Sequence, residues 1–114
     1  MRQINRMFKL WEFRVSHNQL LLRSPKTETE PKNMDIAFVG VEYLDLPTTV
    51  PNPAMLSPDE TDLRKAQEAL GKPVKESDLF VFQIGDRRHL VVAAAMKLFE
   101  NELDIFESSL ERFN

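Results

Sequence analysis

The two histidines, His17 and His89, are the residues of this chain best suited to proton transfer, because histidine titrates near neutral pH. His17 lies in a short polar stretch that is typical of a tight turn rather than of a catalytic centre. His89 ends the run Asp86-Arg87-Arg88-His89. Two cationic neighbours disfavour protonation of its imidazole, and together these side chains could bind an anion. The run also fits a solvated hairpin tip, which we favour.

A carboxylate from elsewhere in the chain would complete a pocket around these residues. Asp104 is the candidate, because together with His89 and Ser108 it supplies the residue types of a serine hydrolase. No Gly-x-Ser-x-Gly turn surrounds any serine, so we predict no catalytic residue. An alternative function, a small enzyme or ligand-binding protein, would use Asp104 and His89 with Arg87 or Arg88 as binding residues.

The sequence contains no pattern for a metal site or a nucleotide cofactor. Without cysteine, the chain can form neither disulfides nor thiolate zinc sites. The acidic run at 100–104 lacks the glycine and the terminal glutamate of an EF-hand loop, so a charged exposed face is the better interpretation. Only three glycines occur, and no two are close enough to form a phosphate-binding loop. We therefore expect no metal and no cofactor.

Size and composition are those of an ordinary globular domain. The 114 residues are 42% hydrophobic and 29% charged, which predicts a single domain over 1–114. A net charge of −3 gives no general attraction to nucleic acid or to an anionic membrane. No apolar stretch is long enough to cross a bilayer or to form the core of a signal peptide. With the absence of cysteine, these features predict a soluble, cytoplasmic protein.

Charge is distributed unevenly along the chain. Residues 1–27 contain six cationic residues and one carboxylate, a balance of +5, whereas residues 98–114 contain five carboxylates and one arginine, a balance of −4. We expect the two ends to attract one another. Aromatic residues among cations are typical of single-strand nucleic-acid binding. However, the alternation of Trp11, Phe13 and Val15 predicts that they share the core face of a strand, so nucleic-acid binding is not predicted.

Two hairpins are predicted near the ends of the chain. The first spans 8–24, and the second spans 79–97 with its turn at Gly85. Between them, the segment 34–46 is apolar on both faces, as expected of a strand in the middle of a sheet. Gly40 within that segment indicates a bulge or a close approach by another side chain.

The clearest local signal predicts a helix over 58–70. Ser57 fits the N-cap, Pro58 the first helical position and Glu60 the acidic position of a capping box. Loss of the Ser57 hydroxyl is expected to cost about 1 kcal/mol. Gly71 is expected to end the helix. Its apolar residues form one narrow face, which predicts that the helix lies against a sheet: Leu63, Ala66 and Leu70.

The last part of the chain has two interpretations. A strand over 103–106 would follow a turn at Asn101, and the valines before it fit a β-meander. Alternatively, apolar residues recur there at helical spacing, namely Leu103, Phe106, Leu110 and Phe113. We favour the strand, as far as about residue 107.

These elements predict an α+β fold, with a mostly antiparallel sheet of five or six strands and one helix packed on it. Polar loops are expected at 25–33 and 47–56. Strands around Phe38 and Val92 are apolar on both sides, so both faces of the sheet need cover. One helix cannot supply all of it. Either the sheet curls on itself or a second copy of the chain covers the remaining face, which makes a homodimer plausible.

Three segments of the chain resemble known sequences: LWEFRVSH at 10–17, LLLRSP at 20–25 and FVGVEY at 38–43. With these segments the chain resembles small bacterial proteins that have no assigned activity. The resemblance implies a stand-alone bacterial domain. It supplies no active site, and no functional residue is transferred from it.

The leading functional prediction is a non-enzymatic protein-interaction module, such as an accessory, regulatory or immunity-type bacterial protein. It rests on the oppositely charged ends, on the long polar loops and on the lack of a nucleophile, metal or phosphate motif. Charge of this kind steers encounters and selects partners. The expected partner is another protein or a second copy of the chain, whereas neither nucleic acid nor a membrane is expected.

Overall fold

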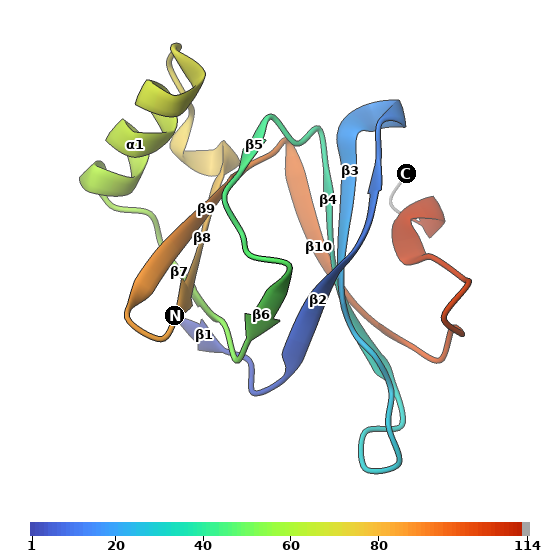
Figure 1. Cartoon of the computed structure of the whole chain (residues 1–114). Helices are drawn as coiled ribbons and strands as arrows, with labels where there is room; N and C mark the ends of the chain where they lie inside the picture. The colour runs from blue at the N-terminus through green and yellow to red at the C-terminus, as the bar shows by residue number, and fades with distance from the viewer. Residues whose placement is uncertain (113–114) are drawn as a thin grey trace.

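The computed structural model describes residues 1–112, and its strands form two antiparallel five-stranded sheets (Figure 1). Sheet A has the order β1 (Arg2–Gln3), β7 (Ala54–Leu56), β8 (Leu79–Ile84), β9 (Arg87–Val92) and β5 (Tyr43–Leu44). Sheet B has the order β10 (Ala95–Asn101), β4 (Asn33–Val39), β3 (Gln19–Ser24), β2 (Met7–Arg14) and β6 (Thr49–Pro51). The predicted α+β class with antiparallel strands and one helix is confirmed, and the strands divide between two sheets.

The two sheets are parts of one curled sheet, because strands of one continue into strands of the other. β1 continues into β2, β6 into β7, β4 into β5 and β9 into β10 after short breaks. β3 pairs with β2 and β2 with β6, and the chain continues from β6 into β7, which pairs with β8. β8 pairs with β9, the chain continues into β10, and β10 pairs with β4, which pairs with β3. The apolar faces are thus covered by curling into a flattened barrel, one of the two arrangements expected.

The predicted hairpins form, but two predicted strands are divided at the barrel corners. β2 and β3 make the first hairpin through the short 3₁₀ turn η1 (Ser16–Asn18), and β8 and β9 make the second through Gly85. The second hairpin's return arm ends at Val92, and the chain then enters sheet B as β10. Likewise β4 ends at Val39 before β5 joins sheet A. A single continuous strand over 34–46 is therefore wrong.

Gly40 makes the corner between β4 and β5 possible. Its φ of 67° lies in the left-handed region, and a Cβ built on it would lie 2.9 Å from the Cβ of Ala94. Ala94 is held there because its N–H donates to the carbonyl of Val39 at 2.9 Å. The close approach predicted at this glycine is confirmed.

The apolar interior forms three layers. The largest cluster fills the space between the sheets and includes Phe8, Phe38 and Phe82, whose rings contact edge to face at Phe38 and Phe82. A second cluster lies between sheet A and the helix α1 (Glu60–Leu70), where Ala66 is buried. A third covers the outer face of sheet B beneath η3 (Ser109–Arg112), where Leu110 is buried. Figure 1 shows α1 and the C-terminal segment on opposite sides of the barrel.

The helix α1 lies against a sheet as predicted, but its N-cap is Asp59 rather than Ser57. The Asp59 carboxylate accepts from the Asp62 N–H at 2.8 Å, and the Asp62 carboxylate accepts from the Asp59 N–H at 2.9 Å. This is a capping box two residues later than expected, so the helix begins at Glu60. The loss of about 1 kcal/mol of stability expected on removing the cap side chain therefore applies to Asp59 and not to Ser57. Gly71 ends the helix in the left-handed conformation, as predicted.

Between residues 1 and 112, no helix combines the length and apolar character required to cross a lipid bilayer. A second 3₁₀ turn, η2 (Glu76–Asp78), connects the end of α1 to β8. The polar loop expected at 25–33 is present and exposed over most of its length, whereas the segment 47–56 contains the short strands β6 and β7.

The C-terminal segment follows neither of its two predicted forms. β10 ends at Asn101, the residues from Leu103 to Ser108 are neither strand nor helix, and only the short η3 follows. The helical alternative also involved Phe113, which lies outside the described residues. Side chains from sheet B donate hydrogen bonds to the backbone carbonyls of this segment. These carbonyls therefore do not accept the backbone hydrogen bonds of a strand or a helix.

We expect Gly40→Ala to lower the free energy of unfolding by about 2–4 kcal/mol, because it combines a strained φ with an overpacked contact to Ala94. Gly85→Ala is the matched control, since Gly85 has a φ of +62° but open space around it, and it should cost only about 1 kcal/mol. Urea unfolding measures both. Equal losses would show that the close approach at Gly40 is not a constraint.

Candidate functional site

A β-bulge in β2 determines which side chains face outward from sheet B. The pairing register with β3 shifts by one residue between Leu10 and Glu12, which leaves Trp11 as the extra residue. A bulge places two consecutive side chains on the same face of a strand. Trp11, Glu12 and Arg14 consequently border one outer cleft, while Leu10 packs against the core between the sheets.

The predicted core face of Trp11, Phe13 and Val15 is therefore wrong. Phe13 is 44% exposed and Val15 is 83% exposed. Trp11 packs instead on the outer face of sheet B with the cluster that contains Leu110. The bulge changes the phase of the alternation at Trp11, so the period-two pattern no longer separates core from surface.

Beneath Trp11, sheet B contains a buried ion pair between Arg23 of β3 and Asp35 of β4. The guanidinium donates to both carboxylate oxygens, from Nε to Oδ1 at 2.8 Å and from Nη2 to Oδ2 at 2.9 Å, and the side chains are 1% and 0% exposed. Asn101 of β10 donates to Asp35 Oδ2 at 3.0 Å. The Arg23 guanidinium also lies 5.5 Å from the centre of the Trp11 ring.

Arg23 binds the C-terminal segment with its remaining nitrogen. Nη1 donates to the carbonyl of Asp104 at 3.2 Å and to the carbonyl of Glu107 at 2.9 Å. These two residues are the ends of a turn closed by the Glu107 N–H, which donates to the Asp104 carbonyl at 3.1 Å. Asn33 of β4 adds a bond from Nδ2 to the carbonyl of Leu103 at 2.7 Å. The buried polar network of sheet B thus fixes the position of this turn.

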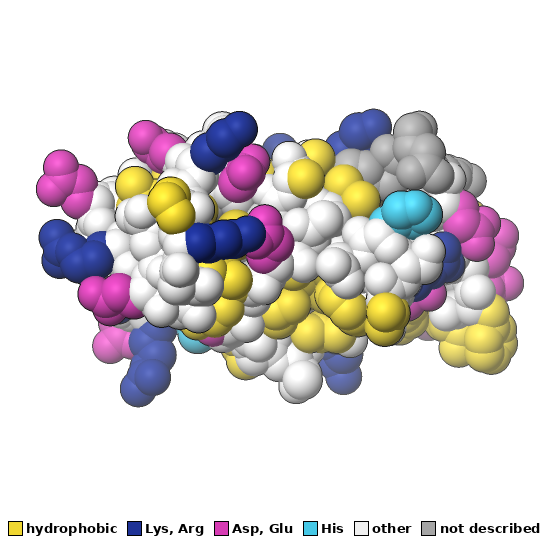
Figure 2. All heavy atoms as spheres, turned by 90° about the horizontal axis from the view of Figure 1, so that it is seen from above, with side chains coloured by type: hydrophobic (Ala, Val, Ile, Leu, Met, Phe, Trp, Pro, Cys, Tyr) yellow, Lys and Arg dark blue, Asp and Glu magenta, His cyan; other side chains and the backbone are white. Residues whose placement is uncertain are grey.

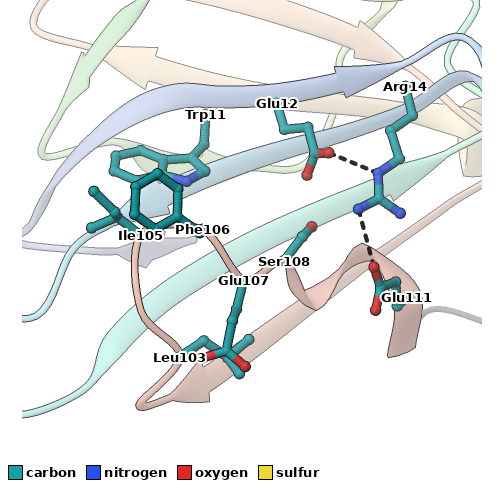
Figure 3. A pocket seen from close by; sticks show the side chains of 9 residues that line it. All are labelled: Trp11, Glu12, Arg14, Leu103, Ile105, Phe106, Glu107, Ser108 and Glu111. Carbon is teal, nitrogen blue, oxygen red and sulfur yellow. Dashed lines mark hydrogen bonds and ion pairs between the residues drawn. The ribbon is translucent and has the colours of Figure 1, made fainter.

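The turn Asp104–Glu107 and strand β2 enclose a cleft of about 540 Å³ (Figure 3). We call it the Trp11 cleft. It combines apolar and charged side chains, with Trp11, Glu12 and Arg14 from β2 and the remainder from the C-terminal segment: Leu103, Ile105, Phe106, Glu107, Ser108 and Glu111. In Figure 3 the Ile105 and Phe106 side chains extend from the turn on the Trp11 side of the cleft.

Arg14 connects the two walls of the Trp11 cleft. Its Nε donates to Glu12 Oε2 at 2.7 Å, and its Nη2 lies 3.5 Å from Glu111 Oε1. Partial burial raises the pKa of Glu12, but the hydrogen bonds from Arg14 and Ser108 oppose this and leave the pKa below its ordinary value. Glu12 is therefore ionised at neutral pH and acts as a partner of Arg14 rather than as a proton donor.

The central residues of the turn are apolar and exposed. Ile105 is 62% exposed and Phe106 is 90% exposed. Residues at such positions are usually glycine, proline, asparagine, aspartate or serine. Figure 2 shows hydrophobic and acidic side chains together at the right-hand end of the molecule, where Figure 1 places the C-terminal segment. This turn therefore displays apolar surface that folding of the described residues does not use.

Three of the four binding residues predicted from the sequence lie together, and the fourth does not. Arg87, Arg88 and His89 border a second hollow of about 490 Å³, which we call the His89 hollow, together with Asp45, Lys65 and Asp86. Asp104 belongs to the C-terminal turn and borders a hollow with Trp11 and Arg23 instead. The expected convergence of Asp104 with His89 is therefore absent.

Two of the predicted residues are bound by neighbouring groups, Arg88 by a carboxylate and His89 by a backbone carbonyl. Arg88 binds Asp62 of the helix α1 through two hydrogen bonds, Nε to Oδ1 at 3.0 Å and Nη2 to Oδ2 at 2.5 Å. His89 Nδ1 lies 3.2 Å from the backbone carbonyl of Asp45 and 3.7 Å from its Oδ1. Arg88 thus attaches α1 to the sheet. A binding role for Arg87, Arg88 and His89 stays a prediction.

Among residues 1–112, no group of three or more histidine, cysteine, aspartate or glutamate side chains is arranged to hold a metal ion. The Trp11 cleft was not predicted from the sequence, yet one signal was available. Arg23 follows three leucines in β3, and Asp35 precedes an apolar run in β4. Single opposite charges in apolar strands indicate a buried pair.

The chain has no significant match in three comparisons, which were made with models of protein families, with curated proteins and with solved structures. Support for its function therefore comes from the geometry of the Trp11 cleft and of the His89 hollow.

We expect Asp62→Asn to destabilise the protein by about 1–3 kcal/mol at pH 7, because it removes the charge that Arg88 binds. The hydrogen bond from Arg88 holds the pKa of Asp62 below its ordinary value of 3.8, and burial opposes this shift. Because the pKa is lower in the folded state, the stabilisation is complete above about pH 5 and is lost as pH falls through the folded pKa.

The free energies of unfolding of the parent chain and Asp62→Asn should therefore differ by a constant amount from pH 8 to about pH 5 and converge in more acidic solution. Urea titrations at several pH values measure this difference. Asp86→Asn, a change in the exposed hairpin turn, is the control and should produce no such convergence. A difference that stays constant down to pH 2 would contradict the assignment.

Proposed function

We propose that this protein is a non-enzymatic protein-interaction module that binds its partner through the Trp11 cleft. The observation that carries the proposal is the exposed pair Ile105 and Phe106, at the centre of a turn that is fixed beside a cleft of about 540 Å³. Aromatic side chains, phenylalanine included, are enriched at protein interfaces, and a few anchor residues carry most of the binding energy.

The turn is held in a form suited to recognition. The Phe106 N–H donates to Asp104 Oδ1 at 2.8 Å, and the Asp104 N–H donates to Glu107 Oε1 at 3.1 Å. Arg23 binds the carbonyls at both ends of the turn. A partner would meet a turn that already has its conformation, so little ordering entropy opposes binding.

The chemistry of the cleft favours a protein over the other ligand classes. Among the described residues that border it, Glu12, Glu107 and Glu111 outnumber the cation Arg14, and this excess of carboxylates disfavours the phosphates of nucleic acid and of anionic lipid. The open, mixed surface fits a short segment with an apolar anchor. We place the function in the bacterial cytoplasm, as an accessory, regulatory or immunity-type activity, and the absence of cysteine supports a reducing compartment.

One reason for expecting a homodimer is removed by the fold. The strands that are apolar on both sides are covered within one chain, by the second sheet, by α1 and by the C-terminal segment. We therefore propose that the partner is a different protein. A second copy of the chain in the cleft would appear in the test below as self-association that depends on Phe106.

A second candidate function uses the His89 hollow. The hydrogen bond between His89 Nδ1 and the Asp45 carbonyl requires the proton on Nδ1, which leaves Nε2 of the neutral ring as the basic nitrogen. Arg87 and Lys65 border the same hollow. A small anion is the ligand class that this arrangement fits, although Asp45 and Asp86 offset much of the positive charge. The Trp11 cleft carries the stronger case.

We expect Phe106→Ala to weaken capture of the partner at least tenfold, because truncating an aromatic anchor typically costs about 2 kcal/mol or more. The immobilised protein would be used to capture partners from its host, and the captured protein would then be purified and its affinity measured by calorimetry.

Met7→Ala is the matched control, because Met7 is also an exposed apolar residue of sheet B but borders a different hollow. It should bind as the parent chain does. Thermal unfolding of both variants would establish that the fold is intact. A purified partner that binds Phe106→Ala and the parent chain equally would contradict the proposed site.

A further inference from the structure

We infer that the Trp11 cleft selects a partner segment in which a lysine or arginine lies next to an apolar side chain. The inference rests on the proposed function, because it specifies the chemistry of the partner at the same site. The apolar side chain would contact Ile105, Phe106 and Trp11, and the cation would lie against the carboxylates of Glu107 and Glu111.

The charge balance of the cleft is the first observation. Three glutamates and one arginine border it, and Arg14 is shared between Glu12 and Glu111. The Arg14 contact with Glu12 is short, whereas its distance to Glu111 is 3.5 Å and the Glu111 side chain is 73% exposed. Glu111 is therefore only weakly compensated.

Glu107 provides the second observation. Its Oε1 accepts the backbone N–H of Asp104, and among the described residues its carboxylate forms no ion pair. Among the described side chains, the same holds for Glu100 at the end of β10 and for Glu102 and Asp104 after it. Asp104 and Glu107, which flank the apolar turn residues, thus have no ion-pair partner among the described side chains.

The basic N-terminal part of the chain does not neutralise these carboxylates, although the attraction between the ends is realised. Arg23 binds the backbone carbonyls of Asp104 and Glu107, and Lys26 Nζ donates to the backbone carbonyl of Glu102 at 2.6 Å. These cations fix the backbone of the segment and leave its carboxylates to face solvent. The segment therefore keeps a negative potential that a cationic partner can complement.

In the sequence of the turn, the residues that offer apolar contact stand next to residues that offer a carboxylate. Asp104 and Glu107 flank Ile105 and Phe106 directly. An apolar anchor seated on Phe106 consequently brings the neighbouring residues of its own chain within reach of a carboxylate. A lysine or arginine at such a position gains both charge attraction and contact of its aliphatic stem with the apolar turn.

The test uses the double variant Glu107→Gln with Glu111→Gln. Glutamine at residue 107 can still accept the Asp104 N–H, so the turn keeps its hydrogen bond while the charge is removed. The matched control is Glu28→Gln with Glu68→Gln, which removes two exposed carboxylates from the loop before β4 and from α1. The probes are three fluorescein-labelled peptides with the same central leucine and tryptophan, flanked by lysines, by glutamates or by serines.

Fluorescence polarisation should show binding of the lysine peptide to the parent chain and to the control variant. Removal of the two carboxylates should weaken that binding roughly two- to tenfold, as expected for two exposed charge contacts. Raising the salt concentration from about 0.05 M to about 0.5 M should also weaken it, because screening shortens the range of the attraction. Phe106→Ala should weaken binding of the same peptide.

Equal binding of the glutamate or serine peptide, with the same dependence on Phe106, would overturn the inference but leave the proposed function in place. Absence of binding by the lysine peptide at millimolar concentration would also overturn it. In that case the proposed function is decided separately, by whether the captured protein partner depends on Phe106.

Discussion

The ion pair between Arg23 and Asp35 is the interaction on which the outer face of sheet B depends. Two charges with almost no exposure are stable only when their hydrogen bonds are satisfied, because the desolvation of each ion costs several kcal/mol. Here the guanidinium satisfies the carboxylate in bidentate fashion, and Asn101 supplies a further donor. Removing one partner of such a pair typically costs about 3–5 kcal/mol.

The Arg23 guanidinium also donates from Nη1, which Asp35 does not use. The carbonyls that accept these bonds explain why residues 103–108 form neither a strand nor a helix. The carbonyls of Asp104 and Glu107 accept hydrogen bonds from Arg23 and not from the backbone of a strand or a helix. A side chain that is buried on the outer face of sheet B thereby also positions an exposed turn. The turn presents Phe106 on a fixed backbone, so the exposed position of this apolar side chain is a consequence of a buried charge.

Local signals predicted most of the elements but not how the strands are shared between sheets. The hairpins, the glycine at the barrel corner and the end of α1 at Gly71 follow from turn chemistry that acts over a few residues. Apolar runs through 34–46 and 90–96 look continuous, because strands that pass from one sheet to another stay apolar across the corner. Local pattern does not determine the N-cap, because Asp59 and Ser57 both fit a cap. The contact of Arg88 with the box formed by Asp59 and Asp62 favours the later position.

The candidate site was less predictable than the fold because it depends on long-range contacts. A one-residue bulge at Trp11 leaves no clear mark in a pattern of alternating aromatics and charges. The C-terminal residues fit a strand and a helix about equally. Neither pattern takes account of the hydrogen bond from Arg23, which lies 81 residues before Asp104 in the sequence. The unequal charges of the two ends did predict attraction, which occurs between Arg14 and Glu111.

Arg23 fixes the turn Asp104–Glu107, and this role can be measured by hydrogen–deuterium exchange. The variant Arg23→Met with Asp35→Asn removes the guanidinium without leaving an unpaired buried carboxylate, and Arg64→Met on the exposed face of α1 is the control. We expect the amides of Phe106 and Glu107 to exchange at least about tenfold faster in the double variant, while those of β8 and β9 stay protected. Unchanged exchange at Phe106 and Glu107 in a folded double variant would contradict the claim.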